Sequence, residues 1–240
     1  MRINKVYILI YAALALGGGS LILFYLFLFF GPFTLVTLGF STVSALVFDA
    51  LLCMLFFLQH SILVRRGVRA RLGKIIPGDY YGAFYAITSG IALLIMVLFW
   101  QRTGTIAMAG GIIYWLLRII FILCIAGFYR GIVSLGFFDP FGTVTIKLKI
   151  HNRKPEALPL TIKGPYRWMR HPLYFFSLCM IWSGPDLTED KLLFNIMWTI
   201  WIIIATLLEE RDLLRDFGNG YREYQSRVPM LIPYKIPPAV

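Results

Sequence analysis

Long runs of apolar residues constrain the fold of this chain more than any other feature of its sequence. The uncharged stretch 80–100 is about the length that a helix needs to cross the roughly 30 Å apolar core of a bilayer. Such runs lack the amphipathic spacing of helices that pack around a soluble core. Of the 240 residues, only 15% are charged, against about a quarter in soluble domains. We therefore predict an all-α integral membrane protein with one membrane domain over residues 1–240.

The predicted bundle has five to six transmembrane helices. Four precede residue 139, and residues 139–240 add a loop, a helix hairpin and a tail. The first run passes Gly17-Gly18-Gly19, which should weaken or kink the helix, and it is too long for a signal peptide. The fifth segment would rise only about 18 Å, too little to span. The predicted segments are 1–30, 35–60, 80–100, 112–136, 172–183 and 192–208.

The net charge of +11 is concentrated between these segments. Residues 65–74 carry five basic residues and no acidic one, and a second basic stretch begins at residue 143. Basic loops mark the cytoplasmic side of a membrane, so both termini are predicted to be cytoplasmic. The charge then predicts anionic lipid headgroups as neighbours, and no nucleic acid. Alternation over 143–150 would permit a short strand.

Few polar residues lie inside the apolar runs. Asp49 falls within the second segment and should face the bundle interior, either as a helix–helix hydrogen-bonding group or as a proton acceptor. Cys53, Cys124 and Cys179 share no close spacing, so the sequence predicts neither a disulfide framework nor a metal site.

Two polar clusters flank the predicted C-terminal hairpin, at 163–174 and 208–227. Ionisable groups at a membrane boundary are expensive to place, and two clusters that meet across a hairpin indicate a functional site. The first reads Gly-x-Tyr-Arg-x-x-Arg-His-Pro-x-Tyr from residue 164 to 174. The second contains Leu-Glu-Glu-Arg-Asp-Leu at 208–213 and Tyr-x-x-Tyr-x-x-x-Val-Pro at 221–229.

These motifs resemble the isoprenylcysteine carboxyl methyltransferase superfamily, whose wider relatives include phospholipid N-methyltransferases and nurim-like membrane proteins. Gln-His-Ser at 59–61, Phe-Asp-Pro-Phe-Gly at 138–142 and the stretch 227–233 narrow the resemblance to bacterial methanethiol S-methyltransferases. The superfamily signature covers the last third of the chain, and the narrower resemblance runs from the second segment to the end.

The resemblance implies an S-adenosylmethionine-dependent methyltransferase, with the cofactor at the cytoplasmic ends of the last helices. Pro172 suits the first position of a helix, which places His171 near the N-cap and directs free N–H groups at an anion. The cofactor carboxylate would bind there, with Arg170 or Arg167 as a charged partner. The remaining candidates are carboxylates for the ammonium and sulfonium and tyrosines for adenine and ribose: Glu209, Glu210, Tyr166, Tyr174, Tyr221 and Tyr224.

A thiol acceptor must become a thiolate before it attacks the methyl group. His60 and Asp139, at predicted cytoplasmic helix ends, are the candidates to take that proton, and Arg170 completes the predicted catalytic set. Each feature also has a structural interpretation. His60 would cap its helix, and Asp139 would begin a turn. The Arg170-His171 pair would anchor lipid headgroups, and the two glutamates would form surface ion pairs. The tyrosines would lie in an interfacial belt.

The predicted reaction, through the narrower resemblance, is methylation of methanethiol to dimethyl sulfide. The alternatives are methylation of an isoprenylcysteine carboxylate or a lipid amine, or a non-catalytic scaffold of the nurim kind. The predicted partners are thus a small thiol or a lipid-soluble substrate, together with membrane lipids. The sequence predicts no oligomeric state.

Overall fold

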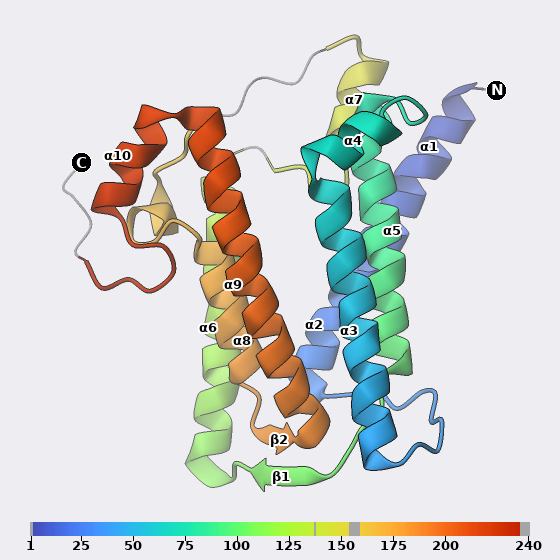
Figure 1. The fold of residues 1–240 in the computed structure, drawn as a ribbon, viewed down its shortest axis with the longest axis vertical. Helices are drawn as coiled ribbons and strands as arrows, with labels where there is room; N and C mark the ends of the chain where they lie inside the picture. The colour runs from blue at the N-terminus through green and yellow to red at the C-terminus, as the bar shows by residue number, and fades with distance from the viewer. Residues whose placement is uncertain (1, 137, 154–158, 236–240) are drawn as a thin grey trace. The chain divides into compact units, whose positions relative to one another are not determined.

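The computed structural model of the chain describes residues 2–136, 138–153 and 159–235 and is mostly helical (Figure 1). Within these residues, five helical segments are long and apolar enough to cross a membrane, with 22 to 29 residues each. The prediction of an integral membrane protein is confirmed at this level. The five segments are Lys5–Phe30, Thr42–Val64, Gly78–Phe99, Gly111–Ser134 and Glu189–Phe217.

The chain divides into two compact units, and each contains stretches that are distant in sequence. One unit comprises Met1–Gly104, Asp139–Ala157 and Thr188–Phe194. The second unit comprises Thr105–Phe138, Leu158–Leu187 and Asn195–Val240.

The first unit is a group of helices around α5. Its helices are α1 (Arg2–Ala12), α2 (Gly19–Phe30), α3 (Thr42–Val64), α4 (Arg66–Leu72), α5 (Gly78–Phe99) and α7 (Thr143–Ile150). A π-helical stretch, η1 (Ala13–Gly18), joins α1 to α2 at the glycines where a weakened helix was predicted. Helix α5 lies very close to η1, as a Cβ at Gly90 of α5 would lie only 2.2 Å from the carbonyl oxygen of Leu16 in η1.

The second predicted segment begins later than expected. Helix α3 starts at Thr42 rather than residue 35, because Ser41 caps it by accepting a 3.3 Å hydrogen bond from the Ser44 N–H. The residues before α3 form a loop, in which the Leu38 N–H donates a hydrogen bond to the side-chain oxygen of Gln101. Asp49 is fully buried and accepts a hydrogen bond from the Gln101 N–H at 3.0 Å, so it is a hydrogen-bonding group as predicted, although its partner lies in the loop after α5 and not in a second helix.

The predicted strand over 143–150 was wrong, because these residues form helix α7. Asp139 lies three residues before the N-cap Gly142, and its Oδ2 caps the first turn from there by accepting hydrogen bonds from the N–H and the hydroxyl of Thr145. The apolar Ile146 is fully buried in a cluster with Ile10 and Ala83. Capping and burial of one helix face therefore outweigh the alternating pattern.

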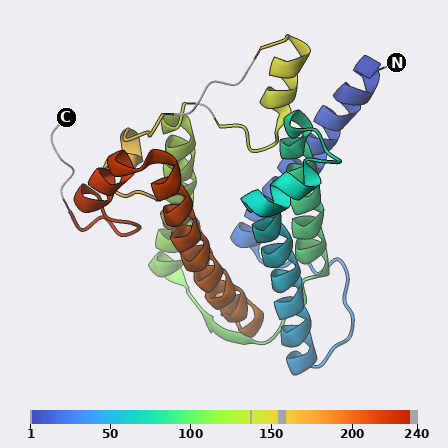
Figure 2. The ribbon, with the colours of Figure 1, turned by 45° about the horizontal axis from the view of Figure 1, so that its top comes forward.

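The second unit contains α6 (Gly111–Ser134), the single turn η2 (Gly164–Arg167), α8 (Pro172–Trp182), most of α9 (Glu189–Phe217) and α10 (Asn219–Arg227) (Figures 1 and 2). Two strands that the sequence did not predict, β1 (Thr105–Met108) and β2 (Asp186–Thr188), pair in the loops. Helix α8 has 11 residues and rises about 16 Å, too little to span a bilayer, as predicted.

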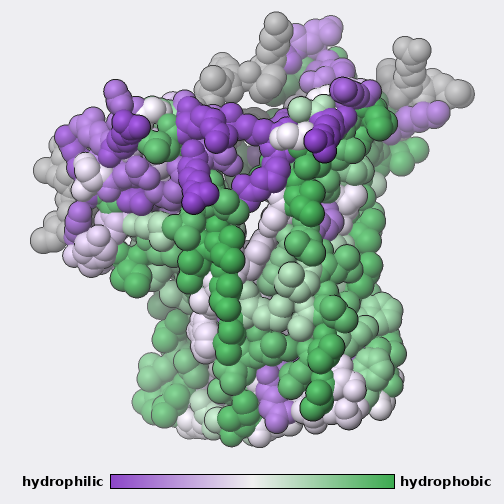
Figure 3. Space-filling view, viewed as in Figure 1, coloured by the Kyte–Doolittle hydropathy of each residue, from purple (hydrophilic) through white to green (hydrophobic). Residues whose placement is uncertain are grey.

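Helix α8 packs closely on both of its neighbours. A Cβ at Gly127 of α6 would lie 2.4 Å from the ring of Phe176, so only glycine permits this approach. On the other side, α8 and α9 are joined by a hydrogen bond from Trp182 Nε1 to Thr199 Oγ1 at 3.0 Å. Helix α9 begins at Glu189 and ends at Phe217, several residues beyond both predicted ends. In the second unit, the helix shafts are apolar on the surface and the end that carries α10 is polar (Figure 3).

Candidate functional site

The candidate site is built where the chain enters α8. Gly164 adopts φ +56, and a Cβ on it would lie 2.2 Å from Ser134 Oγ, so glycine is needed both for conformation and for space. The short turn η2 follows, and then His171 takes the N-cap position with Pro172 at the start of α8. The predicted helix start is therefore confirmed, and it fixes the direction in which Arg170 and His171 leave the backbone.

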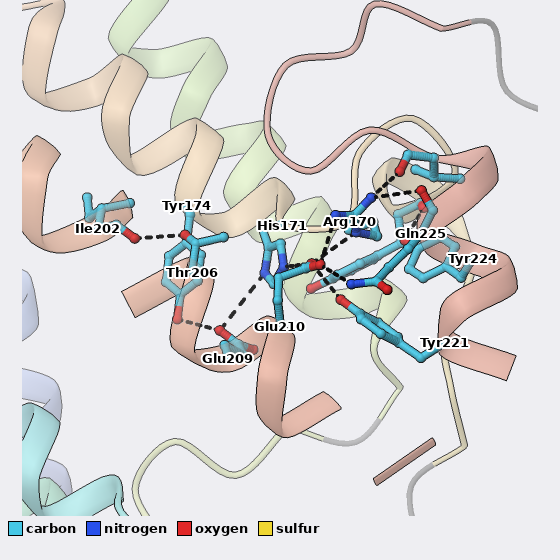
Figure 4. A network of polar contacts seen from close by, with 12 residues as sticks. Arg170, His171, Tyr174, Ile202, Thr206, Glu209, Glu210, Tyr221, Tyr224 and Gln225 are labelled. Atoms are coloured by element: carbon cyan, nitrogen blue, oxygen red, sulfur yellow. Dashed lines mark hydrogen bonds and ion pairs between the residues drawn. The ribbon is translucent and has the colours of Figure 1, made fainter. Parts of the chain in front are cut away.

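Glu210 of α9 is the centre of a buried cluster (Figure 4). Its Oε1 accepts from Arg170 Nε at 2.9 Å and from the Tyr221 hydroxyl at 2.7 Å. The same oxygen accepts from His171 Nε2. Its Oε2 accepts from a second Arg170 nitrogen at 2.8 Å and from Gln225 Nε2 at 2.6 Å. Five donor contacts on one carboxylate leave it little capacity for a further ligand.

Arg170 is shared between this carboxylate and the backbone. One of its guanidinium nitrogens also donates to the carbonyl oxygens of Gln225 and Val228. The side chains of Arg170 and Glu210 are only 10% and 9% exposed, so this is a buried bidentate ion pair. Burial alone would lower the pKa of Arg170, but its hydrogen bonds and charge interaction with Glu210 raise it. Arg170 therefore fastens α8, α9 and α10 together.

The adjacent Glu209 has a different environment. Its side chain is 44% exposed, and His171 Nδ1 lies 3.9 Å from its Oε2. The same oxygen accepts a 2.6 Å hydrogen bond from the Tyr174 hydroxyl. Glu209 and Tyr174 thus form a more open edge of the cluster. Of the two predicted glutamates, Glu209 is the one that remains accessible to a ligand.

Three of the predicted tyrosines are interior residues of this unit. Tyr166, Tyr221 and Tyr224 are 8%, 1% and 4% exposed. The Tyr224 hydroxyl donates to the Tyr166 carbonyl oxygen, and burial followed by the hydrogen bond to Glu210 raises the pKa of Tyr221. The i, i+3 pair on α10 lies on one buried face, as predicted. The hydroxyls of Tyr221 and Tyr224 contact the protein itself, so adenine and ribose binding by the three tyrosines stays a prediction.

The other predicted residues lie elsewhere. Arg167, at the end of η2, lines a cavity of about 490 Å³ in the same unit. His60 and Asp139 belong to the first unit. His60 contacts the Tyr85 hydroxyl, 2.7 Å from its Nε2, and Asp139 caps α7. The structure therefore does not include these two in the Glu210 cluster.

Sequence reasoning missed Gln225, which donates directly to Glu210. A signal was available, because Gln225 follows Tyr221 by four residues and shares its face of α10. It also missed Tyr85, whose partner His60 lies 25 residues away on another helix. No spacing rule in the sequence links these two residues.

Comparison with known proteins identifies the family. The methanethiol S-methyltransferase of Crocosphaera subtropica is 33% identical over 204 residues, which cover 81% of this chain and 77% of that protein. The chain belongs to the methanethiol S-methyltransferase family. Another relative, the methanethiol S-methyltransferase of Mycobacterium tuberculosis, is 29% identical over 196 residues, 80% of this chain and 79% of that protein. The chain is therefore a methyltransferase.

The family's wider relationships agree with the resemblance of the motifs. The phospholipid methyltransferase family matches residues 117–220, which include most of the Glu210 cluster. Nurim of Rattus norvegicus is more distant, at 25% identity over 183 residues, 72% of this chain and 70% of that protein. No solved structure matches the chain significantly.

Proposed function

We propose that this chain transfers a methyl group from S-adenosylmethionine to a small thiol, and that methanethiol is the thiol and dimethyl sulfide the product. One observation carries the proposal. Arg170 and Glu210, 40 residues apart in the two motifs, close into a single buried cluster beside the open edge formed by Glu209 and Tyr174. The names of the relatives that share most of the chain support the choice of thiol.

The residues around α8 fit the charged groups of S-adenosylmethionine. Arg167 and the N–H groups that follow His171 would bind its carboxylate, since the first N–H groups of a helix have no partner within the helix. Glu209, with its exposed carboxylate, would accept from the ammonium. When bound, the cofactor supplies an electrophilic methyl group on a positively charged sulfur. The cofactor pocket is proposed to face the cytoplasm.

Arg170 and Glu210 would act in a different way. Their polar atoms are engaged with each other, with neighbouring side chains and with backbone carbonyls. We propose that they hold the start of α8 and the end of α9 in the positions that binding requires, and that His171 and Tyr221 complete this support. A rigid, water-excluding wall of this kind is what a displacement reaction needs from its protein.

His60 and Asp139 are proposed to accept the thiol proton or to orient the thiol. Both have hydrogen-bonding partners within the first unit, Tyr85 for His60 and Thr145 for Asp139. Replacing either residue by alanine is expected to lower turnover and to leave cofactor affinity within about twofold. Unchanged turnover in both variants would remove them from the reaction.

The chain also needs an orientation in the membrane. We propose that both termini face the cytoplasm of a bacterial inner membrane and that the chain acts as one membrane domain. The basic helix α4, with three arginines and no acidic residue, supports this side for the polar ends. Accessibility of single cysteines introduced in α4 and in the loop at Arg102 to an impermeant reagent would test the orientation.

The test of the reaction uses purified protein in detergent with S-adenosylmethionine and methanethiol, and detects dimethyl sulfide by gas chromatography. Product that depends on both reactants is the expected result. A second candidate is methylation of a lipid amine, which the match to phospholipid methyltransferases over 117–220 favours. Methylated phosphatidylethanolamine without dimethyl sulfide would establish that reaction instead. Failure with both acceptors and with an isoprenylcysteine would favour a nurim-like scaffold.

A further inference from the structure

Two cavities lie in the second unit, and the first includes Arg167, which is proposed to bind the cofactor carboxylate. The first has a volume of about 490 Å³ and lies at the polar start of α8. Among the residues that the structure describes, two arginines and no acidic residue line it, so it is suited to an anion. Its lining residues are Arg130, Gly164, Pro165, Arg167, Trp168, Met169, Phe176 and Pro233.

The second cavity is an open apolar groove of about 700 Å³. It follows α8 from Phe175 to Trp182, a rise of about 10 Å along the helix. None of the described residues that line it is charged, and most of them are aromatic or aliphatic. They are Phe175, Leu178, Cys179, Trp182, Ile203, Met230, Leu231, Ile232 and Tyr234.

The two cavities share a wall. Pro233 lines the first, and its neighbours Ile232 and Tyr234 line the second. Backbone hydrogen bonds fix this segment against the start of α8, from the Arg170 N–H to the Pro229 carbonyl oxygen at 2.9 Å and from the next N–H to the Met230 carbonyl oxygen at 3.0 Å. The wall is therefore held by the same residues that form the Glu210 cluster.

Together, the two cavities match the layout of an amphiphilic lipid in one leaflet of a bilayer. Positive charge lies at the polar end of α8, and the apolar groove runs along the helix away from it. The groove is far larger than a thiol with two heavy atoms, which occupies on the order of two water volumes of about 30 Å³ each. A long hydrocarbon chain matches both its size and its lining.

We propose that these cavities bind one anionic phospholipid, with its phosphate at Arg130 and one acyl chain in the groove, while Arg167 serves the cofactor carboxylate. The lipid is a bound component, not a methyl acceptor. Arginine binds phosphate through charge-assisted and often paired hydrogen bonds. The membrane that surrounds the chain supplies the ligand. This proposal does not depend on the identity of the methyl acceptor.

The test uses delipidated full-length protein in detergent, to which phosphatidylglycerol or phosphatidylcholine of equal chain length is added. Native mass spectrometry measures the lipid that stays bound. We expect one phosphatidylglycerol per chain, and phosphatidylcholine bound about tenfold more weakly. Arg130→Gln should lower phosphatidylglycerol affinity about tenfold, because one charged partner of the phosphate is lost. Arg222→Gln removes an exposed arginine of α10 that lines neither cavity, and should leave affinity unchanged.

The groove is tested separately by filling it. Leu178→Trp, and independently Ile203→Trp, should each lower affinity for the lipid, whereas Leu207→Trp on the exposed surface of α9 should not. Equal binding of the two lipids, or full binding by Arg130→Gln, would overturn the headgroup site. Full binding by both groove variants would overturn the acyl-chain site. S-adenosylmethionine binding, measured on the same samples, separates these outcomes from failure of the proposed reaction.

Discussion

Two buried carboxylates in this protein are held by different kinds of partner. Glu210 in the second unit accepts from the cationic Arg170, from His171 and from neutral groups. Asp190 in the first unit is fully buried, and its partners among the described residues are neutral: Trp100 Nε1 at 2.9 Å, and the N–H and hydroxyl of Thr103 at 2.9 and 2.8 Å.

The difference indicates two roles. The Asp190 contacts attach the loop that contains Thr103 to the first turn of α9. A negative charge is favourable there, at the N-terminus of a helix. The Glu210 contacts join three helices around an ion pair and leave a second carboxylate, Glu209, at the accessible edge. We take the neutral cluster as a structural attachment and the charged cluster as the support of the proposed cofactor site.

The largest expected effect is that of Glu210→Ala. It leaves the Arg170 guanidinium, in a side chain only 10% exposed, without its carboxylate. Removing one partner of a buried ion pair costs about 3–5 kcal/mol, so thermal unfolding in detergent should shift strongly and S-adenosylmethionine binding should be lost. The matched control is the double variant Arg170→Met/Glu210→Leu, which removes both charges and should recover part of the stability but no binding, because His171, Tyr221 and Gln225 still lose their acceptor. Wild-type stability in Glu210→Ala would refute the buried pair.

Asp190→Asn should have a smaller effect. It leaves Trp100 or Thr103 with one unsatisfied buried donor, at a cost of about 1–3 kcal/mol. Because this cluster has no proposed part in binding, calorimetry should give a cofactor affinity within about twofold of the wild type. A large loss of affinity at full folding would mean that the two clusters are not separate in function.

Glu209→Gln should affect binding without affecting stability. The side chain is 44% exposed, so its charge contributes little to folding. Loss of a charged acceptor for the cofactor ammonium should lower affinity about tenfold. The thermal midpoint should stay within a degree or two of the wild type. Wild-type affinity would show that another group binds the ammonium.

Tyr221→Phe should have the smallest effect. It removes one of the five donor contacts to Glu210 and keeps the buried ring. A single neutral hydrogen bond contributes about 1 kcal/mol, so the unfolding midpoint should fall slightly and cofactor affinity should change little. A loss comparable to that of Glu210→Ala would mean that the hydroxyl touches the ligand.

Much of this fold follows from local sequence. The apolar runs predicted the five long helices, and Pro172 after His171 predicted where α8 begins. The start of α3 was misplaced because residues 35–40 are mostly apolar but lie in a loop, where the distant Gln101 bonds to the Leu38 N–H and the Val36 carbonyl oxygen. Helix α7 was mistaken for a strand because its pattern alternates while its cap and buried face decide the structure.

The composition of the site was predictable, but the pairing within it was not. The motifs brought Arg170, His171, Glu209 and Glu210 into one hypothesis. They gave no sign that Glu210 would be enclosed by five donor contacts while Glu209 remains exposed. Adjacent side chains on a helix point about 100° apart, and only packing decides which of them faces inward. Gln225 shows the same limit, since its role depends on where α10 docks.

The most direct test of the account is calorimetric titration of S-adenosylmethionine into the purified wild-type chain, with Glu209→Gln and Asp190→Asn measured alongside. The account predicts one binding site per chain, an affinity about tenfold lower in Glu209→Gln, and an unchanged affinity in Asp190→Asn. Absence of binding by well-folded wild-type protein would contradict it, and the charged cluster would then be a structural attachment like its neutral counterpart.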